Sequence, residues 1–185
     1  MKIKVGISNH HVHLSEESLE ILFGKGYELT VKNELLQKGQ FAANEQVTLQ
    51  RNGKTLEHIR IVGPTRPYTQ VELLEKDNEY FGIKAPVRAS GYLENSESIM
   101  IVGPKGVFMA NSCVIVANRH IHMSAEDLKT FNVENKDVVV VKTNDGILMD
   151  NVTIKSDDTC VLEYHMNKDE AQDLGIENGD EVEIC

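Results

Sequence analysis

Two pairs of histidines stand out in the sequence because each pair has the spacing His-x-His: His11 with His13, and His120 with His122. In an extended segment, residues i and i+2 point to the same face, so the two imidazoles of a pair can converge on one point. Neutral imidazole is a common ligand of zinc and neighbouring transition metals. His165 precedes a further predicted helix start and is a natural additional ligand. This pattern predicts metal binding.

The type of metal site is indicated by the residues that are missing around the histidines. Structural zinc sites usually close with a cysteine-rich tetrahedral set. The three cysteines, Cys113, Cys160 and Cys185, lie away from the histidine pairs in the sequence and form no CxxC motif or even disulfide framework. We therefore favour a catalytic metal site with open positions. The alternative is that the histidines are polar residues at strand ends.

The segment 60–72 contains a second candidate group, with one glycine and two prolines that define a loop. Within it, Arg66 can hold a phosphate or carboxylate through two parallel hydrogen bonds. Glu72 is a candidate metal ligand or base. Spacing alone favours a plainer interpretation, in which Arg66 is a surface-loop arginine and Glu72 an ordinary strand residue.

The elements that must position these residues are mostly short strands. Alternating apolar residues predict strands at 2–7, 46–50 and 54–61, and Asn-Gly between the last two is a strong hairpin signal. Further strands are expected at 28–32, 98–102, 106–109, 113–117, 137–142, 147–155, 159–165 and 181–184. Many short strands separated by turn signals favour a barrel or a sandwich.

Short helices are predicted after three polar capping residues, Ser15, Ser124 and Asn167, each followed by an acidic first turn. Gly24 and Gly175 are the expected helix ends after the first and third of these caps.

An internal repeat connects these caps with the histidines. Residues 9–15 recur as 118–124, and a weaker echo relates 122–137 to 165–180. Val-Gly-Pro also occurs twice, at 62–64 and 102–104. We interpret these echoes as two related β-domains.

Composition narrows the class of protein. The chain has 185 residues and a net charge of −10, which makes it a poor binder of nucleic acid or of anionic membranes. No run of about 18 apolar residues is present, so no transmembrane helix is expected. The chain begins directly with a predicted strand rather than with a signal peptide, and we expect a reducing, cytoplasmic environment.

These motifs closely resemble the PduL-type phosphate propanoyltransferases, also called phosphotransacylases. The matching segments are 8–15, 62–72, 118–124 and 163–167. The resemblance covers nearly the whole chain.

The resemblance implies a mainly β fold with two related β-barrel domains capped by short helices and an active site at the domain interface. Residues 10–117 are expected to form one barrel, and residues 1–9 with 118–185 the other. It also implies two zinc ions per chain and a phosphate-binding, catalytic arginine, Arg66. The implied ligands of one ion are His11, His13 and Glu72, and those of the other are His120, His122 and His165. Glu72 is also an implied catalytic residue.

The implied reaction interconverts a short-chain acyl-CoA plus phosphate with an acyl phosphate plus CoA. Propionyl-CoA or acetyl-CoA is the substrate, and phosphate attacks the thioester directly with assistance from the metal. Two other classes compete with this expectation. One is a dinuclear zinc hydrolase of the thioesterase type, and the other is a non-catalytic module braced by its metals.

Two departures from the family pattern concern His10 and the N-terminus. The first family motif often carries arginine where this chain has His10, whereas the second copy keeps Arg119. Family members packed in bacterial microcompartments, where propanediol is degraded, carry an amphipathic N-terminal extension. This chain starts at its first strand, so we expect a cytoplasmic enzyme at least as much as one packed in a microcompartment. A homo-oligomer is compatible with either location.

Overall fold

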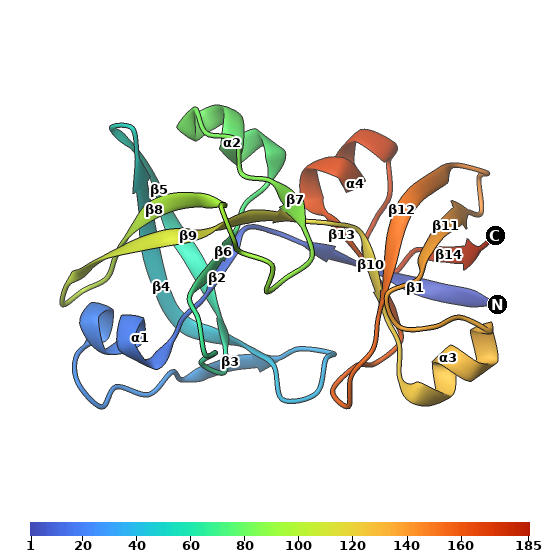
Figure 1. Ribbon diagram of the computed structural model, residues 1–185, viewed down its shortest axis with the longest axis horizontal. Coiled ribbons are helices and arrows are strands. Elements are labelled where there is room, and N and C mark those ends of the chain that lie inside the picture. Colours follow the sequence, from blue (N-terminus) through green and yellow to red (C-terminus); the bar gives the residue numbers. More distant parts are fainter. The chain divides into compact units, whose positions relative to one another are not determined.

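The computed structural model describes residues 1–185 and contains fourteen strands and four short helices (Figure 1). The chain divides into two compact units. The middle unit comprises His10–Leu35 and Gly39–Ala117, and the terminal unit comprises Met1–Asn9, Leu36–Lys38 and Asn118–Cys185. Each unit has its own sheet and its own hydrophobic core.

Six strands of the middle unit pair in a closed ring in the order β4-β5-β2-β6-β9-β8. The central strand β2 (His11–His13) is parallel to β5 and antiparallel to β6. The other members are β4 (Phe41–Arg51), β5 (Lys54–Gly63), β6 (Gln70–Glu72), β8 (Glu97–Val102) and β9 (Val107–Ala117). Two short strands, β3 (Val31–Glu34) and β7 (Val87–Arg88), extend the sheet beyond the ring.

The terminal unit is also a closed barrel, in the order β1-β13-β10-β12-β11-β14. Its strand β10 (His120–His122) is parallel to β12 and antiparallel to β13. The other strands are β1 (Lys2–Ser8), β11 (Val138–Thr143), β12 (Leu148–Lys155), β13 (Glu163–Asn167) and β14 (Glu181–Ile184).

The two rings have the same strand order and the same strand directions. β2, β5 and β6 correspond to β10, β12 and β13, and β9 corresponds to the N-terminal strand β1. Along the chain, β1 of the terminal ring leads into β2 of the middle ring, and β9 of the middle ring leads into β10 of the terminal ring. The pairings confirm the expected fold class, a mainly β protein with two related barrels and short helices.

Three helices begin where the capping residues predict: α1 (Glu16–Phe23), α3 (Ala125–Phe131) and α4 (Lys168–Leu174). The helix α2 (Glu75–Phe81) was not expected, because its N-cap residue is Leu74, which has no side-chain acceptor. Instead, the Asp77 carboxylate accepts a hydrogen bond from the Leu74 backbone N–H at 2.9 Å. None of the four helices has the length and apolar character needed to cross a membrane.

The cores of the two units orient the histidines. Val12 and Ile121, the middle residues of the two His-x-His strands, are fully buried in their respective cores. Because side chains alternate along a strand, the flanking histidines of each pair share the opposite face. Burial of one apolar residue therefore aims two imidazoles in a common direction.

The two Val-Gly-Pro segments are not counterparts in the two barrels, because both lie in the middle unit. Gly63 ends β5, whereas Gly103 follows β8 of the same ring. A Cβ atom on Gly63 would lie 2.4 Å from the ring of Phe41, and one on Gly103 would lie 2.5 Å from the carbonyl oxygen of Leu22. Each glycine allows a separate close contact, so the prediction that this echo reflects the repeat is wrong.

Candidate metal centres and phosphate site

The middle unit brings His11, His13 and Glu72 together on the adjacent strands β2 and β6. In the antiparallel pairing His11 lies directly opposite Glu72. The Nε2 atoms of His11 and His13 are 3.2 Å apart, and the Glu72 carboxylate oxygens lie 3.5 Å and 3.7 Å from them. Sheet register therefore gathers two nitrogens and a carboxylate from positions about 60 residues apart in the chain.

The spacing and chemistry of these donor atoms fit a zinc ion. Ligand atoms about 2.0–2.1 Å from a tetrahedral zinc are about 3.3 Å from one another, close to the separations in this cluster. Two histidines and one glutamate are also a known catalytic donor set, which leaves a fourth position open for water or substrate.

The ring of His13 is held in one orientation and one charge state. Its Nδ1 lies 3.0 Å from the carbonyl oxygen of Val62, so Nδ1–H donates and Nε2 keeps its lone pair for the cluster. Burial lowers the pKa of His13 to about 4, and the positive charge of Arg66 acts in the same direction. Near neutral pH this side chain is therefore an uncharged imidazole, the form that a metal ion binds.

A chain of hydrogen bonds connects this cluster with Arg66. The Gln70 amide nitrogen donates to Glu72 Oε1 at 2.6 Å and to Ser90 Oγ at 2.8 Å. The Arg66 guanidinium donates to the same Ser90 hydroxyl at 3.1 Å. The backbone N–H of Gly91 fixes the other end of the amide by donating to Gln70 Oε1 at 2.8 Å. Arg66 and Glu72 are thus held by one polar network inside a single unit.

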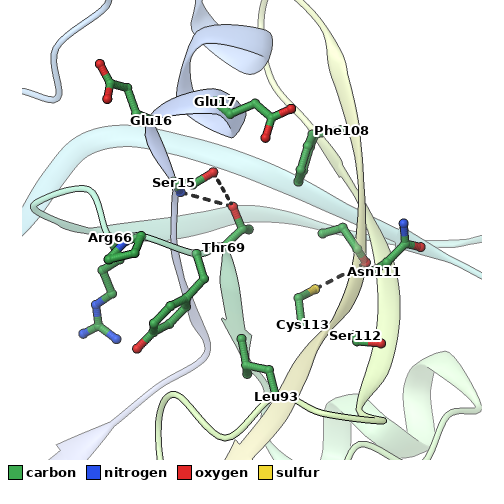
Figure 2. Close-up of a pocket in the computed structure, with 13 residues that line it drawn as sticks. Ser15, Glu16, Glu17, Arg66, Thr69, Leu93, Phe108, Asn111, Ser112 and Cys113 are labelled. Atoms are coloured by element: carbon green, nitrogen blue, oxygen red, sulfur yellow. Dashed lines mark hydrogen bonds between the residues drawn. The ribbon is translucent and has the colours of Figure 1, made fainter.

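A pocket of about 500 Å³ adjoins Arg66 in the middle unit (Figure 2). Its walls include the start of α1, the loop that carries Arg66 and Thr69, and residues Phe108 and Cys113 of β9. Ser15 and Thr69 are hydrogen-bonded at its edge, and the Arg66 side chain extends away from Phe108. Glu16 and Glu17 also line the pocket, so Arg66 is the only cationic side chain in its lining.

The terminal unit gathers the second set, His120, His122 and His165, from β10 and β13. His120 lies directly opposite His165 in the antiparallel pairing, and the Nε2 atoms of His120 and His122 are 3.1 Å apart. The three ring centroids are 4.7–5.1 Å from one another. Three histidines with an open fourth position are a second known catalytic donor set for zinc.

Each ring of this second set has a defined hydrogen-bond partner. His120 Nδ1 contacts the carbonyl oxygen of Asn118 at 2.9 Å, and His122 Nδ1 contacts Cys160 Sγ at 3.3 Å. His165 Nε2 lies 2.5 Å from Oε2 of Glu163. Such outer contacts fix the tautomer and orientation of metal-ligating histidines.

The residue directly before each His-x-His strand, His10 or Arg119, contacts a carboxylate on a helix. His10 pairs with Asp77 at 3.0 Å, and the Arg119 guanidinium hydrogen-bonds Glu170. Both carboxylates are the third residue of their helix, α2 and α4 respectively. His10 and Arg119 therefore occupy equivalent places, and each joins its strand to a helix.

Four residues of these sites were missed by sequence reasoning: Gln70, Ser90, Cys160 and Glu163. A signal for two of them was present. Gln70 precedes Glu72 by two positions and Glu163 precedes His165 by two, the same spacing that revealed the histidine pairs. Ser90 and Cys160 lie in irregular segments, where spacing predicts no partner.

The fold and the two clusters define a duplicated β-barrel protein with candidate metal centres. A family model described as "Phosphate propanoyltransferase" matches residues 4–177. Relatives named phosphate propanoyltransferase include those from Thermotoga maritima (44% identical; 98% of this chain, 88% of the relative), Lachnoclostridium phytofermentans (43%; 98% and 86%) and Salmonella typhimurium (40%; 95% and 85%). The chain belongs to the phosphate propanoyltransferase family and is a phosphate acyltransferase, which confirms the resemblance seen in the motifs.

Proposed function

We propose that this enzyme interconverts a short-chain acyl-CoA plus phosphate with an acyl phosphate plus CoA. The names of its relatives support propionyl-CoA as the substrate, and acetyl-CoA differs by one methylene, which is worth only about 1–3 kcal/mol of discrimination. The observation that carries the proposal is the network that joins the Arg66 guanidinium to the Glu72 carboxylate through Ser90 and Gln70.

Arg66 is the residue that we assign to phosphate. A guanidinium offers parallel N–H donors that match two phosphate oxygens, and its charge offsets the repulsion between phosphate and the electron-rich thioester. Held in this way, a phosphate oxygen forms a bond to the thioester carbonyl carbon, and the carbon–sulfur bond then breaks. CoA leaves as a thiolate, which takes up a proton from solvent.

We propose two zinc ions per chain. His11, His13 and Glu72 would hold one ion, and His120, His122 and His165 the other. Zinc at such sites would supply Lewis acidity and an affinity for the soft sulfur of CoA. The same assignment gives Glu72 its catalytic importance, since Glu72 is both a ligand and the end of the network that begins at Arg66.

Direct attack by phosphate requires no acyl-enzyme. The pKa of Cys113 is raised by burial to about 12, and burial also raises the pKa of Cys160. Buried thiols with raised pKa values are poor nucleophiles.

The proposal extends to the cellular setting that the resemblance implies. We place the enzyme in the cytoplasm or in a bacterial microcompartment for propanediol degradation, as a single chain or a homo-oligomer. Its partners are acyl-CoA, CoA and phosphate, rather than nucleic acid or a membrane.

The proposal is tested by measuring CoA release from propionyl-CoA and acetyl-CoA with a thiol-reactive dye. We expect release that depends on phosphate, is lost after chelation and returns with zinc. Release at the same rate without phosphate would show a thioesterase, and no release from zinc-loaded protein would show a metal-braced module. Either result would overturn the proposed reaction.

A further inference from the structure

The equivalence of the two barrels assigns a counterpart to every residue at the candidate metal centres. In the middle unit Glu72 lies opposite His11, and Gln70 lies opposite His13. In the terminal unit His165 lies opposite His120, and Glu163 lies opposite His122. Each four-residue patch therefore contains one carboxylate, but the carboxylate is at the other position of the second strand.

The Glu163 side chain is held close to the histidines of its patch. Its Oε2 lies 2.5 Å from His165 Nε2, and this contact is the only hydrogen bond of the His165 ring. The Gln37 amide nitrogen approaches the same oxygen at 3.4 Å. Only 18% of the Glu163 side chain is exposed, so the carboxylate is largely enclosed beside the ring.

A glycine on the neighbouring strand makes room for this carboxylate. Gly6 of β1 pairs with His165 of β13, and a Cβ atom at Gly6 would lie 2.7 Å from Cδ and Oε1 of Glu163. In the middle unit the equivalent position is Ile115, a fully buried residue. Gly6 does not adopt a positive φ, so what glycine provides at this position is space for the Glu163 carboxylate, which a Cβ atom would displace.

We propose that Glu163 is a positioning residue of the three-histidine metal centre: it orients the ring of His165 and gives this centre the negative charge that Glu72 gives the other. The inference rests on the metal sites of the proposed function. A carboxylate bound to a metal-ligating histidine fixes its orientation and raises its basicity, and removing such a partner typically costs about 10–100-fold in metal affinity.

The test measures metal binding rather than turnover. In a His11→Ala/His13→Ala background only the three-histidine cluster remains, and Co²⁺ can be titrated into the metal-free protein and followed by its visible absorbance. We expect Glu163→Gln to weaken Co²⁺ binding by about 10–100-fold. Gly6→Ala should weaken it in the same direction, because the added methyl displaces the carboxylate while Glu163 itself is kept.

Two controls separate positioning from a structural role. Glu181→Gln, in the same barrel, removes a carboxylate that pairs with Lys2 at 3.0 Å and should leave Co²⁺ affinity unchanged. Urea unfolding of the metal-free proteins should show Glu163→Gln as stable as its parent. If Glu163→Gln were instead clearly less stable than its parent in the absence of metal, Glu163 would have a structural role and the inference would be overturned.

The outcomes also distinguish this inference from the proposed function. If the parent binds Co²⁺ and Glu163→Gln binds it equally tightly, the inference about Glu163 is wrong and the metal centre stands. If the parent with Glu163 intact binds no Co²⁺, the metal centre in the proposed function fails and the inference fails with it.

Discussion

Gln70 donates a hydrogen bond of 2.6 Å to Oε1 of Glu72, and its amide is the link between that carboxylate and the Arg66 side of the site. The same nitrogen reaches Ser90, whose hydroxyl accepts from the Arg66 guanidinium. The amide that orients Glu72, the proposed metal ligand, therefore also restrains Arg66, the cation that we propose binds phosphate. Changes at the middle of this network should alter phosphate use without removing any group assigned to phosphate or metal.

Ser90→Ala tests that link. The Ser90 hydroxyl accepts the one side-chain hydrogen bond that Arg66 makes, so its loss should leave the guanidinium less well positioned. We expect the KM for phosphate to rise about 10-fold, as for the loss of about 1.4 kcal/mol, with the KM for acyl-CoA unchanged. Steady-state kinetics at varied phosphate concentration measure this effect. Ser98→Ala, which loses a hydrogen bond with Ser112, is the matched control. If Ser90→Ala and Ser98→Ala had the same KM for phosphate, the link would be contradicted.

Arg66 itself should show a selective effect. Arg66→Ala removes the charge and the paired donors, and we expect the phosphate KM to rise by about 10–100-fold or more. Arg66→Lys keeps the charge but not the fork geometry, so it should restore only part of the loss. Arg51→Ala, which removes an arginine paired with Glu97, should retain normal phosphate kinetics. Unchanged phosphate kinetics in Arg66→Ala would refute the assignment.

The stability of the metal-free protein should fall as the pH is lowered from 6.5 to 4. Burial lowers the pKa of His13 to about 4 in the folded state, whereas the ordinary pKa of histidine, 6.5, applies in the unfolded chain. In that window the unfolded chain binds a proton that the folded chain does not, so the free energy of unfolding decreases by up to about 3 kcal/mol. Urea unfolding after chelation measures this slope.

A variant comparison isolates the contribution of His13. His13→Asn should have a shallower dependence on pH between 6.5 and 4 than the parent protein. His58→Asn replaces an exposed histidine that contacts Gln46, and it should keep the parent slope. If His13→Asn kept the slope of the parent protein, burial of this ring would not be the cause of the pH dependence of stability.

The cysteines should differ sharply in reactivity. Cys113 and Cys160 are buried with raised pKa values, whereas Cys185 is exposed. We expect a thiol-reactive dye to label one cysteine in the native protein and all three after denaturation. Cys185→Ser should abolish native labelling and remove this background from CoA-release assays. Rapid labelling of a second thiol in the native protein would contradict the burial of these two residues.

The sequence predicts those parts of the site that depend on local spacing. His11 with His13 and His120 with His122 could be recognised because alternation along a strand is a property of neighbouring residues. Glu72 could not be assigned from spacing, since its place opposite His11 comes from the pairing of two separate strands. The resemblance to a family supplied that assignment.

The same distinction applies to the fold. Capping residues with side-chain acceptors revealed three helices, but α2 was missed because Leu74 supplies no acceptor and Asp77 does the capping from inside the helix. The ring order of the strands, and the place of β1 in the terminal barrel, depend on pairings between distant segments. The role of Gly6 could not be predicted either, because it depends on the Glu163 side chain, which lies beside it from another strand.

The central claim is that phosphate, not water, accepts the acyl group. The most direct measurement is ³¹P NMR of a reaction containing zinc-loaded enzyme, propionyl-CoA and inorganic phosphate, with free CoA quantified in parallel. We predict a new acyl phosphate resonance that grows in step with CoA, and that grows much more slowly for Arg66→Ala at the same subsaturating phosphate concentration. Release of CoA with no acyl phosphate signal, even at early times, would contradict the account.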